Sequence, residues 1–234
     1  MTERIGLVAG TVFYEQDYFR DGEFEARETS YGPAAVVITD RWAYIPRHGL
    51  RGGEYRPPHR INHPANLTLL KELGITEVIG VNSCGSLRPS LEPGSVVLPS
   101  DYICLTNITT VFDAERGHII PCLSEVVRGK LKIAAETADV HLVEGGIYWQ
   151  NQGPRLETKA EIRLQSHYAD MVGMTMANEA TVAQELGLKY ASLCSVDNHA
   201  HGLSPTPLTA EEILENAAAN SDKIYRILQA YTID

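Results

Sequence analysis

The sequence of 234 residues predicts one α/β domain of three layers, in which helices flank a mixed central sheet. Apolar runs of strand length alternate with helical patterns along the whole chain, which is typical of this class. Two strand-like runs, residues 34–38 and 42–45, stand close together and predict a hairpin, so the sheet is not purely parallel. No repeat, linker or low-complexity tract interrupts the pattern, and residues 1–234 are therefore expected to form a single domain.

Short apolar runs indicate the other strands. The first is expected at residues 5–9 and is followed by Gly10 and Thr11. The hairpin continues into Pro46-Arg47-His48-Gly49 and then into residues 50–63, where abundant Gly, Pro, Arg and His predict a surface loop. Further strands are expected at residues 78–81, 95–98, 146–150, 170–175 and 190–196. Polar residues follow several of these strands, which is where ligands bind in open α/β sheets.

Helical patterns fill the intervals between the strands. They are expected at residues 64–73, 123–138 and 208–230, and in the runs that follow Glu157 and Asn178. Gly74 predicts the end of the first helix. Asn178 resembles an N-terminal cap, and Thr209 predicts the cap of the last helix, whose first turn carries two glutamates.

Composition limits the classes of partner. The net charge of −10 and the pI of about 5.3 argue against a nucleic-acid backbone as ligand. The four cysteines lack the spacing of zinc ligands or of a disulfide framework, so a reducing compartment is expected. No apolar run reaches the ~18 residues of a membrane span, and no signal peptide is recognisable at the N-terminus. These features predict a cytoplasmic protein with neither metal nor membrane.

Several polar residues at predicted strand ends are suited to binding an anion. Arg47 offers a planar fork of donors and His48 an adjacent ring donor. Thr11 follows a glycine, and successive backbone N–H groups around Ser83 are able to form an anion-binding nest. Each of these features is equally compatible with an ordinary turn or a solvated strand end.

Three residues in the second half of the chain are further candidates for ligand contacts. Glu157 follows a Gly-Pro turn, although a glutamate is also favoured in the first turn of a helix. Asn198 offers one donor and one acceptor side by side, although asparagine is also common in turns. Met174 is suited to packing against a sugar, and core packing is the alternative.

Taken in order, these motifs resemble a known family, the trimeric purine nucleoside phosphorylases and especially their methylthioadenosine phosphorylase branch. The resemblance covers about residues 5–228. Its most specific parts are Gly-Pro-Arg-Leu-Glu-Thr at residues 153–158 and Val-Gly-Met-Thr at residues 172–175. The motifs that support it are Gly10-Thr11, Pro46-Arg47-His48-Gly49, Asn62 with Asn66, residues 82–87, Glu92-Pro93-Gly94 and Glu179.

The resemblance implies a nucleoside phosphorylase fold and phosphorolysis of a purine nucleoside to free purine and ribose 1-phosphate. Inorganic phosphate is the co-substrate, and no metal or organic cofactor is expected. The phosphate ligands carried over are Thr11, Arg47, His48, Ser83 and Thr175. The nucleoside-binding residues are Asn82, Ser83, Leu156, Glu157, Met174, Asn198 and Ala210, with catalytic roles for Asn198, His48 and Glu157. The family also implies a homotrimer or hexamer, in which His118 reaches a neighbouring subunit's site.

Two positions depart from the methylthioadenosine branch and favour a 6-oxopurine. That branch has a serine in place of Glu157 and an aspartate in place of Asn198, whereas the present pair resembles the inosine and guanosine enzymes. A shift of one residue would bring Asp197 into the position of Asn198 and restore a preference for adenine. Ala210 suits a 5′-methylthio group better than a hydroxyl, so inosine, guanosine and 5′-methylthioinosine are all expected substrates.

Three alternatives remain at this stage. The first is a 5′-methylthioadenosine phosphorylase. The second is a nucleosidase that uses water, against which the retained Thr11, Arg47 and His48 argue. The third is a non-catalytic nucleoside-binding protein on the same fold, favoured only by Val12, because relatives have a glycine after the threonine.

Overall fold

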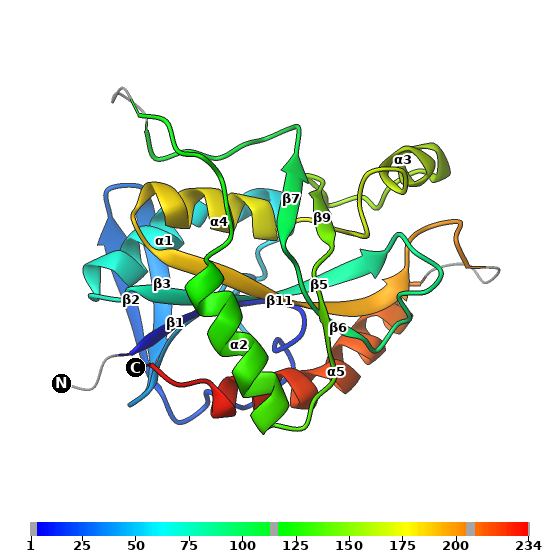
Figure 1. Cartoon of the computed structure of the whole chain (residues 1–234). Helices are drawn as coiled ribbons and strands as arrows, with labels where there is room; N and C mark the ends of the chain where they lie inside the picture. Colours follow the sequence, from blue (N-terminus) through cyan, green and yellow to red (C-terminus); the bar gives the residue numbers. More distant parts are fainter. Residues whose placement is uncertain (1–3, 113–116, 205–208, 234) are drawn as a thin grey trace.

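The computed structural model describes residues 4–112, 117–204 and 209–233, and it confirms the α/β class with helices on both faces of a mixed sheet (Figure 1). Eleven strands within these ranges form one sheet. They are β1 (Ile5–Ala9), β2 (Glu23–Thr29), β3 (Gly32–Ile38), β4 (Trp42–Pro46), β5 (Glu77–Ser86), β6 (Val96–Leu98), β7 (Asp101–Cys104), β8 (Leu142–Glu144), β9 (Ile147–Gln150), β10 (Met171–Gly173) and β11 (Lys189–His199).

The long strand β5 lies at the centre of the sheet. It pairs in parallel with β1 on one side and with β11 on the other. Strands β3 and β4 are antiparallel, as the predicted hairpin requires, and β4 then runs parallel to β1. On one side the order continues from β5 through β10 and β9 to β7. On the other side β11 pairs with β6, and β6 pairs with β8.

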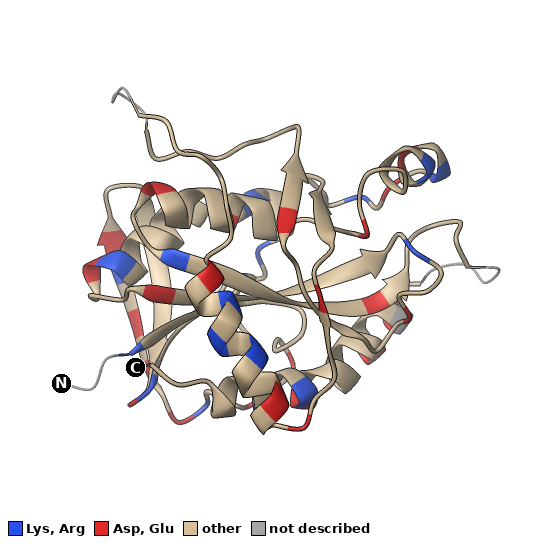
Figure 2. Ribbon diagram, viewed as in Figure 1, with Lys and Arg blue, Asp and Glu red and all other residues tan. Residues whose placement is uncertain are grey.

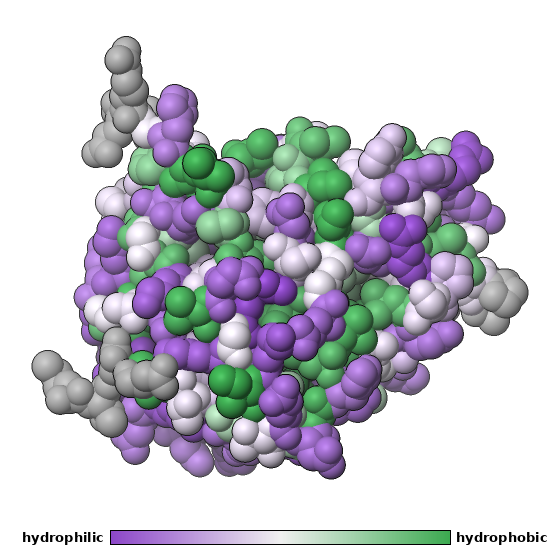
Figure 3. Space-filling model, viewed as in Figure 1, coloured by the Kyte–Doolittle hydropathy of each residue, from purple (hydrophilic) through white to green (hydrophobic). Residues whose placement is uncertain are grey.

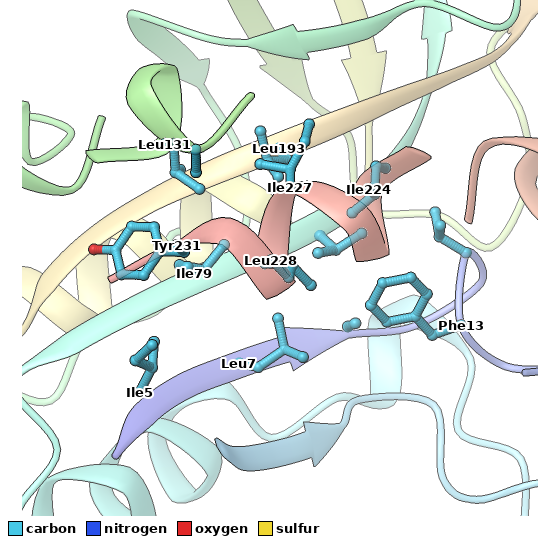
Figure 4. Close-up of a cluster of buried hydrophobic side chains, with 14 of the residues drawn as sticks. Ile5, Leu7, Phe13, Ile79, Leu131, Leu193, Ile224, Ile227, Leu228 and Tyr231 are labelled. Atoms are coloured by element: carbon cyan, nitrogen blue, oxygen red, sulfur yellow. The ribbon is translucent and has the colours of Figure 1, made fainter. Parts of the chain in front are cut away.

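The helices cover the two faces of the sheet. They are α1 (His63–Glu72), α2 (Glu125–Thr137), α3 (Lys159–Gln165), α4 (Met176–Glu185) and α5 (Ala210–Ala230), with a short 3-10 turn at Pro58–Arg60. Successive residues of β5 pack on opposite faces of the sheet. Ile79 packs with α2 and α5, whereas Val78 packs with α1 and α4. Figure 4 shows the first core, where Leu7, Ile79 and Leu193 of the sheet meet Ile224, Ile227 and Leu228 of α5.

Strand β5 changes partner along one of its edges, and this creates an opening. Its first half pairs with β1 up to Val81, and its last two residues pair with β10. Between these two partners, residues 82–84 have a neighbour only on the β11 side in the described sheet. The carboxyl ends of β1, β4 and β11 come together at this opening, as at the switch point of other α/β sheets.

Two sequence predictions about elements need correction. Helix α4 begins at Met176 with Thr175 as its cap, not near Asn178. The reason is tertiary: Oε1 of Gln150 accepts hydrogen bonds from the N–H groups of Ala177 and Asn178 and so satisfies the first turn. Strands β2, β7 and β8 were not expected, and β2 is mostly exposed, so it lacks the apolar pattern by which strands are recognised.

The surface is mixed in charge and partly apolar. Figure 2 shows acidic and basic residues spread over most elements, with basic ones gathered on α2. Figure 3 shows hydrophobic side chains along β7 and the segment that follows it, where Leu105, Ile108 and Ile120 are 69%, 61% and 88% exposed. No helix within the described ranges is both long enough and apolar enough to span a membrane.

Candidate active site

A cavity of about 530 Å³ lies at the opening beside β5. Residues that follow β1 and β4, the end of β11, the start of α4 and the loop before α3 all contribute to its wall. Nine of the residues predicted from the sequence line it together: Thr11, Arg47, His48, Ser83, Leu156, Glu157, Met174, Thr175 and Asn198. Segments far apart in the chain therefore converge at the carboxyl ends of the strands.

Of the other predicted residues, Asn82 and His118 do not line this cavity, and the side chain of Ala210 is not among those described. Asn82 is fully buried behind it. His118 is exposed and lines a different hollow beside β7 and α4. Ala210 is the first residue of α5, and its side chain lies outside the described residues.

Asn82 orients Thr175 instead of facing a nucleoside. Its Oδ1 accepts a hydrogen bond from the Ser192 hydroxyl at 2.6 Å, which fixes the amide. Its Nδ2 then donates to Oγ1 of Thr175 at 2.8 Å. Because Thr175 accepts this bond, its own hydroxyl proton is available to an anion in the cavity.

Arg47 is held in place by a buried carboxylate. Its Nη2 donates to Glu179 and to the carbonyl of Val8, both at 2.9 Å, and its Nη1 donates to the carbonyl of Val81 at 2.8 Å. Nε lies 2.7 Å from the other Glu179 oxygen. Of the five N–H groups of a guanidinium, these contacts leave one on Nη1 for a ligand.

Glu179 is itself part of a buried network. Tyr190 donates to it at 2.8 Å, and Nδ1 of His63 lies 3.9 Å away. Burial raises the pKa of Glu179, while the adjacent Arg47 lowers it. Burial and the charge of Arg47 together lower the pKa of His63 to about 3, so the imidazole is neutral and Arg47 and Glu179 form the charged pair.

His48 is neutral and has a defined tautomer. Burial and the neighbouring Arg47 lower its pKa to about 4. Its Nδ1 lies 2.7 Å from the carbonyl of Arg56, which can only accept, so Nδ1 carries the proton. Nε2 is therefore an acceptor, suited to a phosphate or sugar hydroxyl, and not the donor that the sequence suggested. The ring lies against Gly10, where a Cβ would stand 2.4 Å from Cδ2 of His48.

Glu157 is a buried carboxylate with one oxygen occupied. It is 7% exposed, and Oε1 accepts a hydrogen bond from Asn151 at 2.7 Å. Asn151 is paired in turn with the amide of Gln165, which donates to its Oδ1 at 3.1 Å. Burial raises the pKa of Glu157, and the Asn151 bond opposes that shift. The free oxygen can accept from an N–H group of a ligand.

Asn198 faces the cavity, and its neighbour Asp197 does not. Nδ2 of Asn198 donates to the carbonyl of His199 at 2.8 Å, which leaves one N–H and Oδ1 for a ligand. A bulge in the pairing of β11 with β5 falls between Val196 and Asn198. Asp197 is the extra residue, is fully buried and does not line the cavity, so the geometry gives no support to Asp197 as the base-reading residue.

Sequence reasoning missed several residues that line the cavity. They are Tyr55, Pro57, Pro58, His201, Ile213 and Leu214. Tyr55 comes from the expected surface loop and stacks on His48, with ring centroids 5.4 Å apart. An aromatic residue among the Arg and His of that loop was the one available signal. Nothing local in the sequence indicates that Ile213 and Leu214 of α5 reach this cavity.

Val12 was the only feature that favoured a non-catalytic protein. Its side chain is 1% exposed and packs in the core with α5, and it does not line the cavity. The departure from glycine at this position therefore leaves the ligand-facing groups of Thr11 and His48 in place.

The cavity is polar at two places and apolar between them. One polar group comprises Thr11, Arg47, Ser83 and Thr175, whose donors suit an oxyanion, and His48, whose Nε2 can accept from a hydroxyl of phosphate. The other comprises Glu157 and Asn198, which can pair with the polar edge of a flat heterocycle. Met174 and Val172 contribute apolar wall. This arrangement fits a ligand with an anion at one end and a base at the other.

Comparison with known proteins agrees with this geometry. Residues 4–232 match the model of the phosphorylase superfamily. A probable 6-oxopurine nucleoside phosphorylase of Archaeoglobus fulgidus is 40% identical over 96% of this chain and 94% of its own length. A probable S-methyl-5′-thioinosine phosphorylase of Methanothermobacter thermautotrophicus is 36% identical over 97% of this chain and 82% of its own.

A solved structure shares the fold. The methylthioadenosine phosphorylase of Schistosoma mansoni in complex with adenine superimposes with a TM-score of 0.87 and 24% identity, over 97% of this chain and 90% of that one. The match to the family model spans nearly the whole chain and includes every segment that lines the cavity. The chain therefore belongs to the phosphorylase superfamily and is a member of its purine nucleoside phosphorylase family.

Proposed function

We propose that this protein catalyses the phosphorolysis of 6-oxopurine nucleosides to free purine and ribose 1-phosphate. The observation that carries the proposal is the presence of Glu157 and Asn198 on one cavity with Thr11, His48 and Thr175. The first pair suits the base, and the other residues suit phosphate. The relatives from A. fulgidus and M. thermautotrophicus, whose names specify 6-oxopurine and thioinosine substrates, support the same class.

The preference for a 6-oxopurine follows from hydrogen-bond polarity. A 6-oxopurine presents N1–H as donor and O6 as acceptor. The free oxygen of Glu157 accepts the first, and the remaining N–H of Asn198 donates to the second while its Oδ1 can accept from N7–H. A 6-aminopurine reverses both edges and leaves buried polar groups mismatched, at about 1–3 kcal/mol each.

Positioning and electrostatics provide the catalysis in this proposal. The C1′–N9 bond breaks, a phosphate oxygen bonds to C1′, and the purine leaves with the bonding electrons. Phosphate held by Thr11, Arg47, His48, Ser83 and Thr175 stabilises the cationic sugar and is also the nucleophile. Asn198 stabilises the negative charge that develops on the base. No metal is required in this scheme, so we expect EDTA to leave turnover unchanged.

The 5′ substituent is the part of the substrate that distinguishes inosine from 5′-methylthioinosine. Ile213 and Leu214 near the start of α5, together with Leu156, give the cavity an apolar wall. Apolar wall favours a methylthio group over a hydroxyl. We therefore include 5′-methylthioinosine among the proposed substrates.

Release of free base tests the function directly. Inosine, guanosine, adenosine and the 5′-methylthio forms of inosine and adenosine are each incubated with and without phosphate. We expect phosphate-dependent release, fastest with a 6-oxopurine. Equal release without phosphate would indicate a nucleosidase, and a preference for both 6-amino substrates would indicate a methylthioadenosine phosphorylase. A ligand-induced rise in melting temperature without turnover would indicate a binding protein.

We further propose that the protein assembles as a homotrimer or as a dimer of trimers, with a cytoplasmic location. Leu105, Ile108 and Ile120, in the segment after β7, expose most of their apolar side chains. Exposed apolar residues that gather in one segment favour an interface with another subunit. His118 lies in the same segment. We expect sedimentation at micromolar concentration to give three or six copies, and His118→Ala to raise the KM for nucleoside. A fully active monomer would contradict this assembly.

A further inference from the structure

Asp197 is a buried carboxylic acid beside the cavity that the proposed reaction does not use. It is the extra residue of the β11 bulge, because Val196 pairs with Cys84 of β5 and Asn198 pairs with Gly85. The bulge gives consecutive side chains different surroundings. Asn198 lines the cavity, whereas Asp197 is fully buried behind it.

Neutral polar groups surround the Asp197 carboxyl. The Ser195 hydroxyl donates to Oδ1, and Nδ2 of Asn220 in α5 donates to Oγ of Ser195 at 2.9 Å. Ser83 of β5 stands opposite Ser195 in the pairing of the two strands, and its hydroxyl lowers the pKa of the carboxyl. The backbone carbonyl of Asp197 accepts from Asn216 at 2.7 Å. Oδ2 has no partner of standard hydrogen-bond geometry among the described residues. A buried oxygen of this kind gains from any donor that can turn toward it.

Ser83 connects this carboxyl to the ligand. It is half-buried, belongs to the stretch of β5 that is paired only with β11 in the described sheet, and lines the cavity. Its hydroxyl has one proton. If that proton points to an ionised Asp197, the serine oxygen faces the cavity only as an acceptor. If Asp197 is protonated, the acid can donate to Ser83, and the serine can then donate to a ligand.

The charge state of Asp197 changes near neutral pH. Burial raises its pKa to about 7, and the hydrogen bonds from Ser195, Ser83 and Asn220 oppose the shift. Among the described groups that influence this pKa, none is charged. Cys84 is the titratable neighbour on β5, and Asp197 contributes to raising its pKa. Lys223 of α5 donates to the carbonyl of Gly94 at 2.8 Å and to Oδ1 of Asn220 at 3.3 Å, and within the described structure it does not bond to Asp197.

We propose that Asp197 is a positioning residue of the phosphate site, which acts through Ser83 and withdraws one donor from bound phosphate when it loses its proton. The proposal rests on the proposed function, since it takes phosphate as the ligand beside Ser83. A hydroxyl that accepts instead of donating weakens the binding of an anion. The loss of this proton should therefore weaken phosphate binding above neutral pH, in addition to any effect of the other ionisable groups.

Calorimetric titration with inorganic phosphate alone tests the proposal without turnover. The ratio of Kd between Ser83→Ala and the unmodified protein is measured at about pH 6 and at about pH 8.5, so that the ionisation of phosphate itself cancels. We expect a ratio of about 3–10 at the lower pH, the effect of one hydrogen bond, and a ratio near 1 at the higher pH. In an Asp197→Asn background the ratio should not change with pH.

Two results would overturn the proposal: a ratio that is the same at both pH values, or the same pH dependence with Asn at position 197. Glu77→Gln is the matched control, because Glu77 is another buried carboxylate of β5 that Lys130 and Tyr231 hold at the far end of the strand. It should retain the pH dependence. If Asp197→Asn does not fold, Asp197→Ser also removes the ionisable group.

A different result would contradict the proposed function. Normal phosphate binding without phosphate-dependent base release would contradict the function, while the calorimetric ratios would still decide the role of Asp197. Absence of phosphate binding in the unmodified protein would overturn both.

Discussion

Arg47 carries a charge in a buried position because Glu179 neutralises it. The two side chains are 2% and 0% exposed, and they meet through two contacts of 2.7 and 2.9 Å. The removal of one partner leaves an unpaired buried charge, which typically costs about 3–5 kcal/mol. The pair therefore both supports the fold and presents a single N–H group to the cavity.

Replacement of Arg47 should consequently affect stability as well as phosphate binding. We expect Arg47→Ala to raise the KM for phosphate at least about tenfold, to change nucleoside binding little and to lower the melting temperature. Adding Glu179→Gln removes the unpaired charge and should restore part of the melting temperature without restoring the KM. If the double variant recovers phosphate binding too, Arg47 acts only through stability.

Asn198 should determine which purine is accepted. We expect Asn198→Asp to shift the ratio of kcat/KM for inosine over adenosine towards adenosine by tens-fold, because a carboxylate accepts from a 6-amino group where the amide donates to O6. The ratio is measured for both nucleosides and for their 5′-methylthio forms. Asn62→Asp is the control, because Asn62 caps α1 outside the cavity and aspartate keeps the cap. It loses the bond from Nδ2 to the Tyr31 carbonyl, so it should lower stability and leave the ratio unchanged. An unmodified enzyme that already prefers adenosine would refute the role of Asn198.

At the scale of elements, the ends of neighbouring strands position the site. β1 and β4 run in parallel and end side by side at Ala9 and Pro46, so Thr11 and His48 follow at the same edge of the sheet. The turn after β1 must leave space for the imidazole. Gly10 provides it, since a Cβ there would also stand 2.8 Å from Nε2 of His48 and 3.1 Å from Cγ of Arg47.

Gly10→Ala should therefore displace the His48 ring and weaken its bond to the Arg56 carbonyl. We expect kcat/KM for phosphate to fall at least about tenfold, while the helices and strands remain folded by circular dichroism. The matched control is Gly129→Ala in the interior of α2, where an added Cβ meets no atom within 4 Å. That change should retain activity and add about 0.5–1 kcal/mol of stability. Equal activity of both variants would show that the His48 position is not critical.

At the scale of the whole molecule, the packed layers force some acids to be buried without a counter-ion. Asp197 of β11 is buried against α5, and burial raises its pKa to about 7. In the unfolded chain an aspartate titrates near pH 4. Between these values the folded protein binds more protons than the unfolded chain. Stability from this group is thus fully present below about pH 4 and is lost as pH rises through about 7.

This linkage predicts a pH-dependent stability difference. From about pH 5.5 to about pH 8.5 the free energy of unfolding of the unmodified protein should fall by about 2 kcal/mol relative to that of Asp197→Asn. Urea unfolding of both proteins at the two pH values measures the difference. A constant difference between the two proteins would mean that Asp197 does not titrate in this range.

The local pattern of the sequence was enough for most elements. The apolar runs gave β1, β5 and β11, the short connection gave the β3–β4 hairpin, and Gly74, with a φ of +78°, ended α1 where a glycine was expected. Local physics governs these features, because backbone propensity and apolar period act over a few residues. The predictions for the exposed strand β2 and for the start of α4 were wrong because contacts with residues distant in the sequence determine these features.

The sequence predicted which kinds of residue face the ligand, but not their hydrogen-bond partners or protonation. The chain order of Thr11, Arg47, His48, Glu157, Thr175 and Asn198 indicated a phosphate-and-purine site, and the fold brings all six to one cavity. Only the tertiary structure shows that Glu179 contacts two of the donor nitrogens of Arg47. It also shows that the Arg56 carbonyl fixes the tautomer of His48 and that Asn82 lies behind Thr175. Hydrogen-bond partners, burial and protonation depend on groups far apart in sequence, so residue order determines the type of site, and packing determines which donors and acceptors face the ligand.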